Sequence, residues 1–200
     1  ASSIALLLDD IPEDYKNKFG DKISEGTSHG ALANMLSESL GKNIYFVPRI
    51  YADELIKDEP NYLKDLSLVL NPKIRVFYCG KNVVSKTLTN CSTAKKFLSN
   101  EIIYWDNYYA NDYCPKKFFI GPWKNTHLIE KSMINGTGMI ETDKLIIEIV
   151  NKTALKKNLL LWKKILLEHN VPEVFFKICH NFLSPSFTFE KKIKSFKHSH

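Results

Sequence analysis

Five short apolar runs alternate with helical patterns, and this alternation limits the possible folds more than any other feature of the chain. The runs span 4–8, 44–47, 74–79, 102–105 and 133–134, and turn or polar residues follow each. Helical patterns lie between them, at about 28–40, 61–70, 92–98 and 141–151. One strand and one helix in every roughly 30 residues is the pattern of right-handed βαβ units. The sequence therefore predicts an α/β fold with a parallel sheet.

After residue 152 the pattern changes to helix alone. Apolar residues at Leu155, Leu159, Trp162 and Leu166, with lysines opposite, predict a helix over 154–168, and a second pattern covers 174–183. We therefore expect two parts, an α/β part at 1–152 and a lysine-rich helical segment at 153–200. The stripe favours packing against the preceding part, while a membrane-surface role for these helices stays open.

The net charge of +6 raises the question of a nucleic-acid partner. Only Arg49 and Arg75 of the 28 basic residues are arginine, the residue that phosphates and guanine favour for bidentate contacts. We expect no specific nucleic-acid partner, with contact between residues 154–197 and a polyanion as the alternative. No run approaches the roughly 20 apolar residues of a membrane helix, so we expect no transmembrane segment.

The cysteines and histidines indicate neither disulfides nor a metal. Cys79, Cys91, Cys114 and Cys179 form no CxxC pair and are too sparse for a disulfide scaffold, so free thiols are expected. Free thiols favour a reducing, intracellular compartment. No histidine pair has metal-ligand spacing, and we expect no metal and no cofactor.

Carboxylates, amides and aromatic residues gather directly after two of the predicted strands. Asp9-Asp10 follow the first run, and the segment 105–112 follows the fourth. Strand carboxyl ends are where β/α barrels carry their catalytic groups. Neighbouring carboxylates can share a pocket only where the chain leaves the sheet, and one can then act as an anion beside the other as an acid. Aspartates also stabilise turns and caps, so the pair has a structural explanation as well.

The order of these segments resembles glycoside hydrolase family 84, the β-N-acetylglucosaminidases. The family's strand ending Asp-Asp-Ile is similar to 8–11, and its Phe-Cys-Pro-Thr-Glu-Tyr strand to 46–51. Its Pro-x-Ile-x-Val and Gly-x-x-Val-x-Ser segments resemble 72–76 and 80–85. Its Trp-Asp-Asn, Asn-Asp and Leu-Gly-Pro-Tyr series resembles 105–107, 111–112 and 120–123, with Ile134-Asn135 at family-like spacing. The resemblance runs in unbroken order from Leu6 to about Val150.

The resemblance implies a (β/α)8 barrel of the TIM type and hydrolysis of terminal β-linked N-acetylglucosamine from glycans or glycoproteins. The mechanism would be substrate-assisted and retaining, with an oxazoline formed by the sugar's own acetamido group. Asp9 would orient the acetamido N–H, and Asp10 would protonate the departing oxygen and then deprotonate water. The other implied contacts are Tyr51 on the acetamido oxygen, Cys79 beside the acetamido pocket, Trp105 on its methyl wall, Asn107 on the acetamido and carboxylate region, and Asp112 and Asn135 on sugar hydroxyls.

Three departures from the family pattern stand near these residues. Cys79 replaces the usual threonine, Arg49-Ile50 replace threonine and glutamate, and 123–125 differ from a tyrosine, basic residue and glycine. A complete barrel has eight strands, and five are predicted here. We therefore expect an incomplete barrel, its last five β/α units followed by C-terminal helices, that needs amino-terminal strands for activity. The alternative is a non-catalytic sugar-binding or interaction module derived from the same fold.

Overall fold

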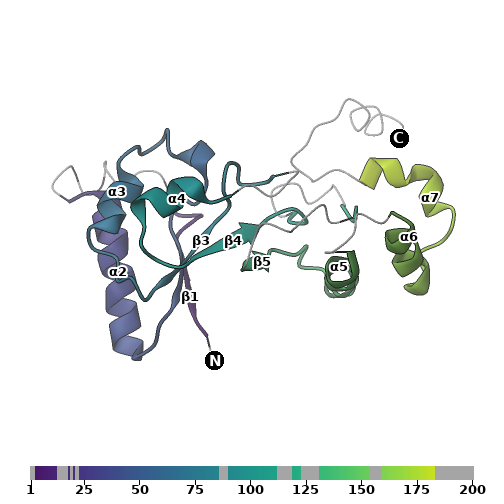
Figure 1. Cartoon of the computed structure of the whole chain (residues 1–200), viewed down its shortest axis with the longest axis horizontal. Coiled ribbons are helices and arrows are strands. Elements are labelled where there is room, and N and C mark those ends of the chain that lie inside the picture. Colours follow the sequence, from purple (N-terminus) through teal and green to yellow (C-terminus); the bar gives the residue numbers. More distant parts are fainter. Residues whose placement is uncertain are drawn as a thin grey trace. The chain divides into compact units, whose positions relative to one another are not determined.

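The computed structural model describes residues 3–12, 18, 20, 23–85, 90–111, 119–122, 131–153 and 159–182. These residues form a five-stranded sheet in the order β1-β2-β3-β4-β5 (Figure 1). The strands are β1 (Ala5–Leu7), β2 (Tyr45–Val47), β3 (Arg75–Tyr78), β4 (Ile102–Asp106) and β5 (Ser132–Ile134). The structure confirms all five predicted strands and the α/β class.

The sheet is parallel, as the alternation of strands and helices predicts. Leu7 pairs with Val47, and Phe77 pairs with Ile103, both in parallel register. Between β4 and β5, the Tyr104 N–H donates to the Lys131 carbonyl (3.1 Å), and two residues later the Asp106 carbonyl accepts from Asn135. The two bonds advance along both strands in the same direction, so β5 continues the parallel order.

Contacts divide the chain into two compact units. The first unit comprises Ala1–Val83, Thr89–Trp105 and Lys131–Met133, and the second comprises Val84–Leu88, Asp106–Glu130 and Ile134–His200. In the first unit, an apolar cluster of Val47, Ala52, Phe77, Cys79, Ile103 and Trp105 covers one face of the sheet. Its helices are α2 (Glu25–Leu40), η1 (Asp53–Leu55), α3 (Tyr62–Ser67) and α4 (Ser92–Phe97).

Helix α2 begins earlier than its apolar pattern indicates. The sequence places its start at about residue 28, whereas the helix begins at Glu25 because the Ser24 side chain accepts a hydrogen bond from the Thr27 N–H (3.2 Å) and caps the first turn. Its other end is the predicted one, since Gly41 takes the left-handed conformation (φ 58°) that closes the last turn.

Two glycines let α2 lie directly against α3, beside which it runs in Figure 1. A Cβ atom on Gly26 would come within 2.3 Å of the Tyr62 carbonyl oxygen, and one on Gly30 within 2.5 Å of Val69 Cγ2. No other residue leaves room for this contact. The close approach places the first two turns of α2, which carry Glu25 and His29, next to Tyr62.

The second unit contains α5 (Ile140–Thr153), α6 (Leu159–Glu168), α7 (Phe175–Ile178) and η2 (Cys179–Phe182). Its core joins Ile146 and Ile149 of α5 to Trp162, Ile165 and Leu166 of α6. The predicted stripe is right at Trp162 and Leu166 but wrong at Leu159, which is 59% exposed, whereas Ile165, outside the predicted stripe, is fully buried. Leu155 lies outside the described residues. The predicted boundary at residues 152 and 153 stays a prediction, and α5 and α6 pack together across it.

Among the described residues, no helix has both the length and the apolar character needed to cross a membrane.

Candidate active site

The aspartate pair lies where the first strand leaves the sheet. The Leu8 N–H donates to the Val47 carbonyl (3.0 Å), and the chain then turns at Asp9 and Asp10. Asp9 is half-buried and Asp10 is exposed. Within a strand, neighbouring side chains point to opposite faces of the sheet. Asp9 and Asp10 lie beyond the end of the strand, so this alternation does not force their carboxylates apart.

Three of the predicted site residues meet in the apolar cluster of the first unit. Tyr51 follows β2, Cys79 follows β3 and Trp105 lies near the end of β4. The Tyr51 and Trp105 rings are 5.8 Å apart, and the Cys79 N–H donates to the Tyr51 carbonyl at 2.7 Å. Because β1 is the neighbour of β2 in the sheet, the strand that leads to Asp9 lies beside the strand that leads to Tyr51.

The Trp105 indole nitrogen is notable within this cluster. Trp105 is only 7% exposed, and its Nε1 is the one buried side-chain nitrogen or oxygen of the described residues that has no hydrogen-bond partner. An unpaired buried donor destabilises a protein, commonly by about 1–3 kcal/mol. The indole N–H can therefore donate to an acceptor that the described residues do not supply.

Two predicted amides meet in the second unit. The Asn135 side chain donates from Nδ2 to Asn107 Oδ1 (3.1 Å), and the Asn135 backbone N–H donates to the Asp106 carbonyl (2.8 Å). Asp106 is almost fully buried, and its Oδ1 accepts from the Tyr108 N–H. Asn107 and Asn135 are thus fixed by the ends of two strands, as their position after the apolar runs predicts. Asp112 lies outside the described residues.

The loop after Asn135 is held by an aspartate that the sequence did not single out. Asp143 Oδ1 accepts from the Thr137 N–H (2.7 Å) and from the Thr137 hydroxyl (2.8 Å), and its Oδ2 accepts from the Gly138 N–H. This carboxylate also occupies the space beside Gly136, where an added Cβ would come within 2.9 Å of all three carboxylate atoms. The sequence pattern that could have predicted these bonds is a glycine- and threonine-containing loop followed by acidic residues in the first turn of α5.

Two tyrosines directly after Asn107 bind the segment at Gly121 and Pro122 through their hydroxyls. Tyr108 and Tyr109 donate their hydroxyls to the Pro122 and Gly121 carbonyls at 3.1 and 2.9 Å. Burial raises the pKa of both phenols well above the usual range, and the nearby Asp106 carboxylate raises each pKa further. Both hydroxyls are therefore protonated near pH 7 and can donate these bonds.

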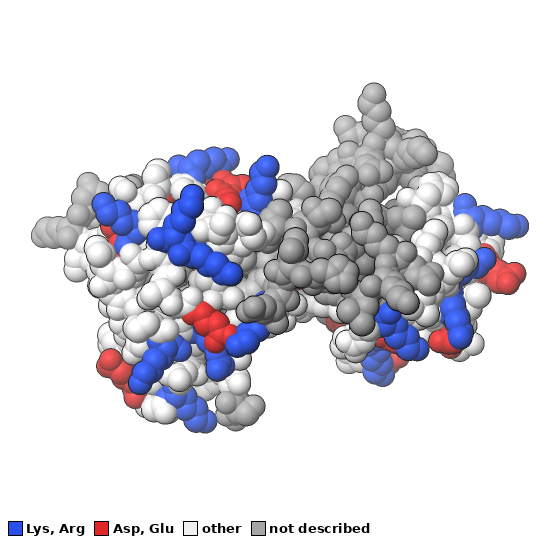
Figure 2. Space-filling model, in the orientation of Figure 1, with Lys and Arg blue, Asp and Glu red and all other residues white. Residues whose placement is uncertain are grey.

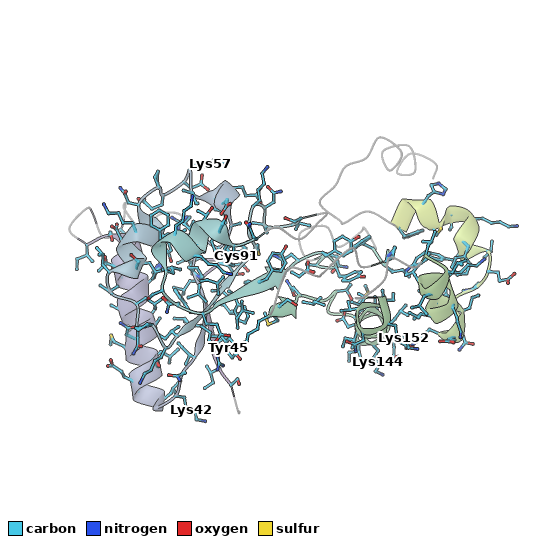
Figure 3. The ribbon with its side chains drawn as sticks, in the orientation of Figure 1. Lys42, Tyr45, Lys57, Cys91, Lys144 and Lys152 are labelled. Carbon is cyan, nitrogen blue, oxygen red and sulfur yellow. The ribbon has the colours of Figure 1, made fainter. Side chains whose placement is uncertain are left out.

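Two thiols of the first unit are buried. Cys79 is fully buried and Cys91, at the start of α4, is 6% exposed (Figure 3). Burial raises the pKa of the Cys91 thiol to about 11. Among the described residues, no group of three or more histidine, cysteine, aspartate or glutamate side chains is arranged to hold a metal ion.

A family model described as beta-N-acetylglucosaminidase matches residues 1–142. Protein O-GlcNAcase of Rattus norvegicus and that of Mus musculus are each 32% identical to this chain over 142 residues, which cover 64% of this chain. The same alignment covers 15% of either relative. The chain thus spans about one seventh of the length of these curated relatives.

Two solved structures share the fold. CpGH84B superposes with a TM-score of 0.66 at 18% identity, covering 90% of this chain and 34% of that one. An aspartate-to-asparagine mutant of the O-GlcNAc hydrolase of Thermobaculum terrenum superposes with a TM-score of 0.65 at 22% identity, covering 84% and 40%. The predicted barrel-type α/β fold is confirmed by these likenesses. With its first 142 residues matched by the family model, the chain belongs to the β-N-acetylglucosaminidase family.

Proposed function

We propose that this chain carries the acetamido-binding and acid–base part of a β-N-acetylglucosaminidase site, which acts on terminal β-linked N-acetylglucosamine of glycans or glycoproteins. The observation that carries the proposal is the acidic turn at Asp9 and Asp10 on the strand next to the one that leads to the Tyr51 and Trp105 cluster. The family membership supports it as well.

The proposed reaction is substrate-assisted. The acetamido oxygen of the sugar forms a bond to the anomeric carbon as the bond to the departing oxygen breaks, and Asp10 gives its proton to that oxygen. Asp9 accepts a hydrogen bond from the acetamido N–H and stabilises the positive charge of the oxazoline. Water then attacks the anomeric carbon, Asp10 takes the proton from water, and the oxazoline opens to the acetamide with retained configuration.

The remaining site residues are proposed to bind the sugar. Tyr51 donates to the acetamido oxygen, Trp105 lies along the acetamido methyl group, and Cys79 borders the same group. Asn107 holds the acetamido and carboxylate region, while Asp112 and Asn135 bond sugar hydroxyls. A site that pairs with substrate hydroxyls discriminates strongly against analogues that lack them. The amide pair of Asn107 and Asn135 supports this assignment, because it fixes the two side chains relative to one another.

Binding and turnover are to be measured separately, because the chain covers a small part of its relatives' length. Binding of an oxazoline mimic is measured by calorimetry, and turnover by release of 4-nitrophenol from its N-acetyl-β-glucosaminide. We expect Asp10→Asn to keep mimic binding and, in a version of the chain extended by the amino-terminal strands, to lower kcat about a hundredfold to ten-thousandfold, the usual contribution of a general acid. Asp9→Asn should weaken mimic binding, since it removes the anion that stabilises the charged ring.

Asp58→Asn is the matched control, because Asp58 is an exposed aspartate of the same unit. It should leave both binding and turnover as in the wild type. Unchanged turnover in Asp10→Asn, or no binding of the mimic by the wild-type chain, contradicts the proposal.

A second function, sugar binding without hydrolysis, is favoured by one observation. Cys79 is fully buried at a position where the family pattern has a threonine hydroxyl, so the acetamido region here lacks one hydrogen-bonding group. Binding of the mimic with no turnover in the wild-type chain, and turnover gained in Cys79→Thr, would support that function.

A further inference from the structure

A buried ion pair joins α2 to the segment that follows β2. The Arg49 guanidinium binds the Glu25 carboxylate through two parallel bonds, from Nε to Oε1 and from Nη2 to Oε2, the second at 2.6 Å. The side chains of Arg49 and Glu25 are 8% and 4% exposed. Two-point contact of this kind fixes direction as well as distance.

Tyr62 of α3 anchors the backbone of the same arginine. Its hydroxyl accepts a hydrogen bond from the Arg49 N–H (3.1 Å) and lies 2.8 Å from His29 Nδ1. The guanidinium also lies over the Tyr62 ring, 5.9 Å from its centre. Both the main chain and the side chain of Arg49 are therefore tied to the two helices that meet at Gly26.

Tyr51, two residues later, packs against the apolar cluster of the first unit. Its ring contacts Trp105, and its carbonyl accepts the Cys79 N–H at 2.7 Å. The next backbone bond, from the Asp53 N–H to the Gly80 carbonyl (2.8 Å), continues the attachment to the end of β3. The short segment from Arg49 to Asp53 is thus held by the helices at one end and by β3 at the other.

We propose that Glu25 and Arg49 are positioning residues, whose ion pair sets where the Tyr51 phenol stands for the acetamido group of the sugar. The role of the pair toward the sugar rests on the proposed function, while the anchoring of Tyr51 does not. Arg49 stands where the family pattern has threonine, so this chain holds the segment before Tyr51 with a side chain that the pattern lacks.

Stability alone does not account for such a pair. Moving two charges out of water costs free energy, and the attraction between them offsets this cost only when their geometry is good. Apolar residues of similar size commonly stabilise a core equally well or better. A double variant, Glu25→Leu with Arg49→Met, therefore separates the two roles. It keeps the volume and the apolar packing and removes the side-chain tether, while the backbone bond from residue 49 to Tyr62 stays.

The experiment has two readouts. The first is amide hydrogen exchange of Cys79, whose N–H reports the position of the Tyr51 carbonyl without any ligand. We expect exchange about tenfold faster or more in the double variant, at a thermal midpoint close to that of the wild type. The second is binding of the oxazoline mimic, which should weaken by roughly tenfold, the order expected for a misplaced contact group.

The matched control removes another ion pair of the same unit. Arg75 binds Glu101 at 3.2 Å with both side chains more than one third exposed, at the amino end of β3. Arg75→Met with Glu101→Leu should leave Cys79 exchange and mimic binding as in the wild type. If the first double variant fails to fold, Arg49→Lys serves instead, since lysine keeps the charge without the two-point contact. Faster Cys79 exchange is expected there too.

Unchanged Cys79 exchange in the folded variant overturns the inference, and so does equal acceleration in the control. A wild-type chain that binds no mimic contradicts the proposed function, and the exchange measurement still decides whether the ion pair positions Tyr51.

Discussion

His29 lies buried among groups that can carry charge or form hydrogen bonds. It faces the Glu25 carboxylate at 3.9 Å and the Tyr62 hydroxyl at 2.8 Å, with the Arg49 guanidinium close by. Burial lowers the pKa of His29 below its ordinary 6.5, Glu25 opposes this change and Arg49 adds to it. The imidazole is therefore neutral in the folded protein near pH 7, with Nδ1 as the acceptor of the Tyr62 hydroxyl proton.

The first prediction concerns the stability of the protein in acid. As pH falls through 6.5, the unfolded chain takes up a proton on His29 and the folded protein does not, so the free energy of unfolding falls by at most about 1.4 kcal/mol per pH unit from this group. His29→Asn, whose Oδ1 can accept the same hydrogen bond, should lose less stability between pH 7.5 and pH 5.5. Urea unfolding at the two pH values measures the difference.

A measurement at pH 8 gives the packing cost of His29→Asn, because the histidine is neutral there in both states. If the variant and the wild type lose equal stability on acidification, His29 does not contribute to the pH dependence.

Strands and helix ends were predictable where the local sequence alone specifies them. The apolar runs give all five strands, and Gly41 gives the end of α2. The beginning of α2 was placed too late because its first turn is polar and rests on the Ser24 cap. Tyr51, Cys79 and Trp105, which the resemblance names as site residues, lie in one apolar cluster, and their roles stay predictions. The pairing of Glu25 with Arg49 was not predictable, since nothing local selects one acid and one base 24 residues apart.

The second prediction concerns the contact between α2 and α3. Gly26→Ala should destabilise the protein by about 1–3 kcal/mol, because the new Cβ meets the backbone oxygen of Tyr62, which cannot move without displacing α3. Gly30→Ala should cost less, since the nearest atoms are the ends of the Val69 and Leu66 side chains. The higher helix propensity of alanine, worth up to about 1 kcal/mol, works against both losses.

Urea unfolding of the two variants gives the comparison. A Gly26→Ala protein at least as stable as Gly30→Ala would show that the helices can separate without loss.

On the face of the molecule that Figure 2 shows, charges of both signs are interspersed among the described residues. Figure 2 shows lysine and arginine side chains (blue) among aspartate and glutamate side chains (red) on the face in view. On α5, Lys144 and Lys152 both project from the helix (Figure 3) and pair with Glu141 and Glu148. The two arginines, Arg49 and Arg75, are likewise paired with glutamates, so a carboxylate opposes phosphate binding at each of them.

The third prediction follows from this charge distribution. Binding to a short DNA duplex should be weak at low salt and should fall with a shallow slope as salt rises, because few phosphates are neutralised. Fluorescence anisotropy over a series of salt concentrations measures the slope, with a strongly basic peptide as the positive control. A steep slope would instead support a polyanion surface in the lysine-rich segment at 153–200.

Alkylation of the two buried thiols, Cys79 and Cys91, can report opening of the first unit. Alkylating reagents react with exposed thiolates, whereas Cys79 and Cys91 are both buried and burial also raises the pKa of the Cys91 thiol to about 11. Cys79 adjoins Tyr51, so its modification requires a transient opening beside that tyrosine. The rate of alkylation at Cys79 therefore measures how often the region around Tyr51 opens.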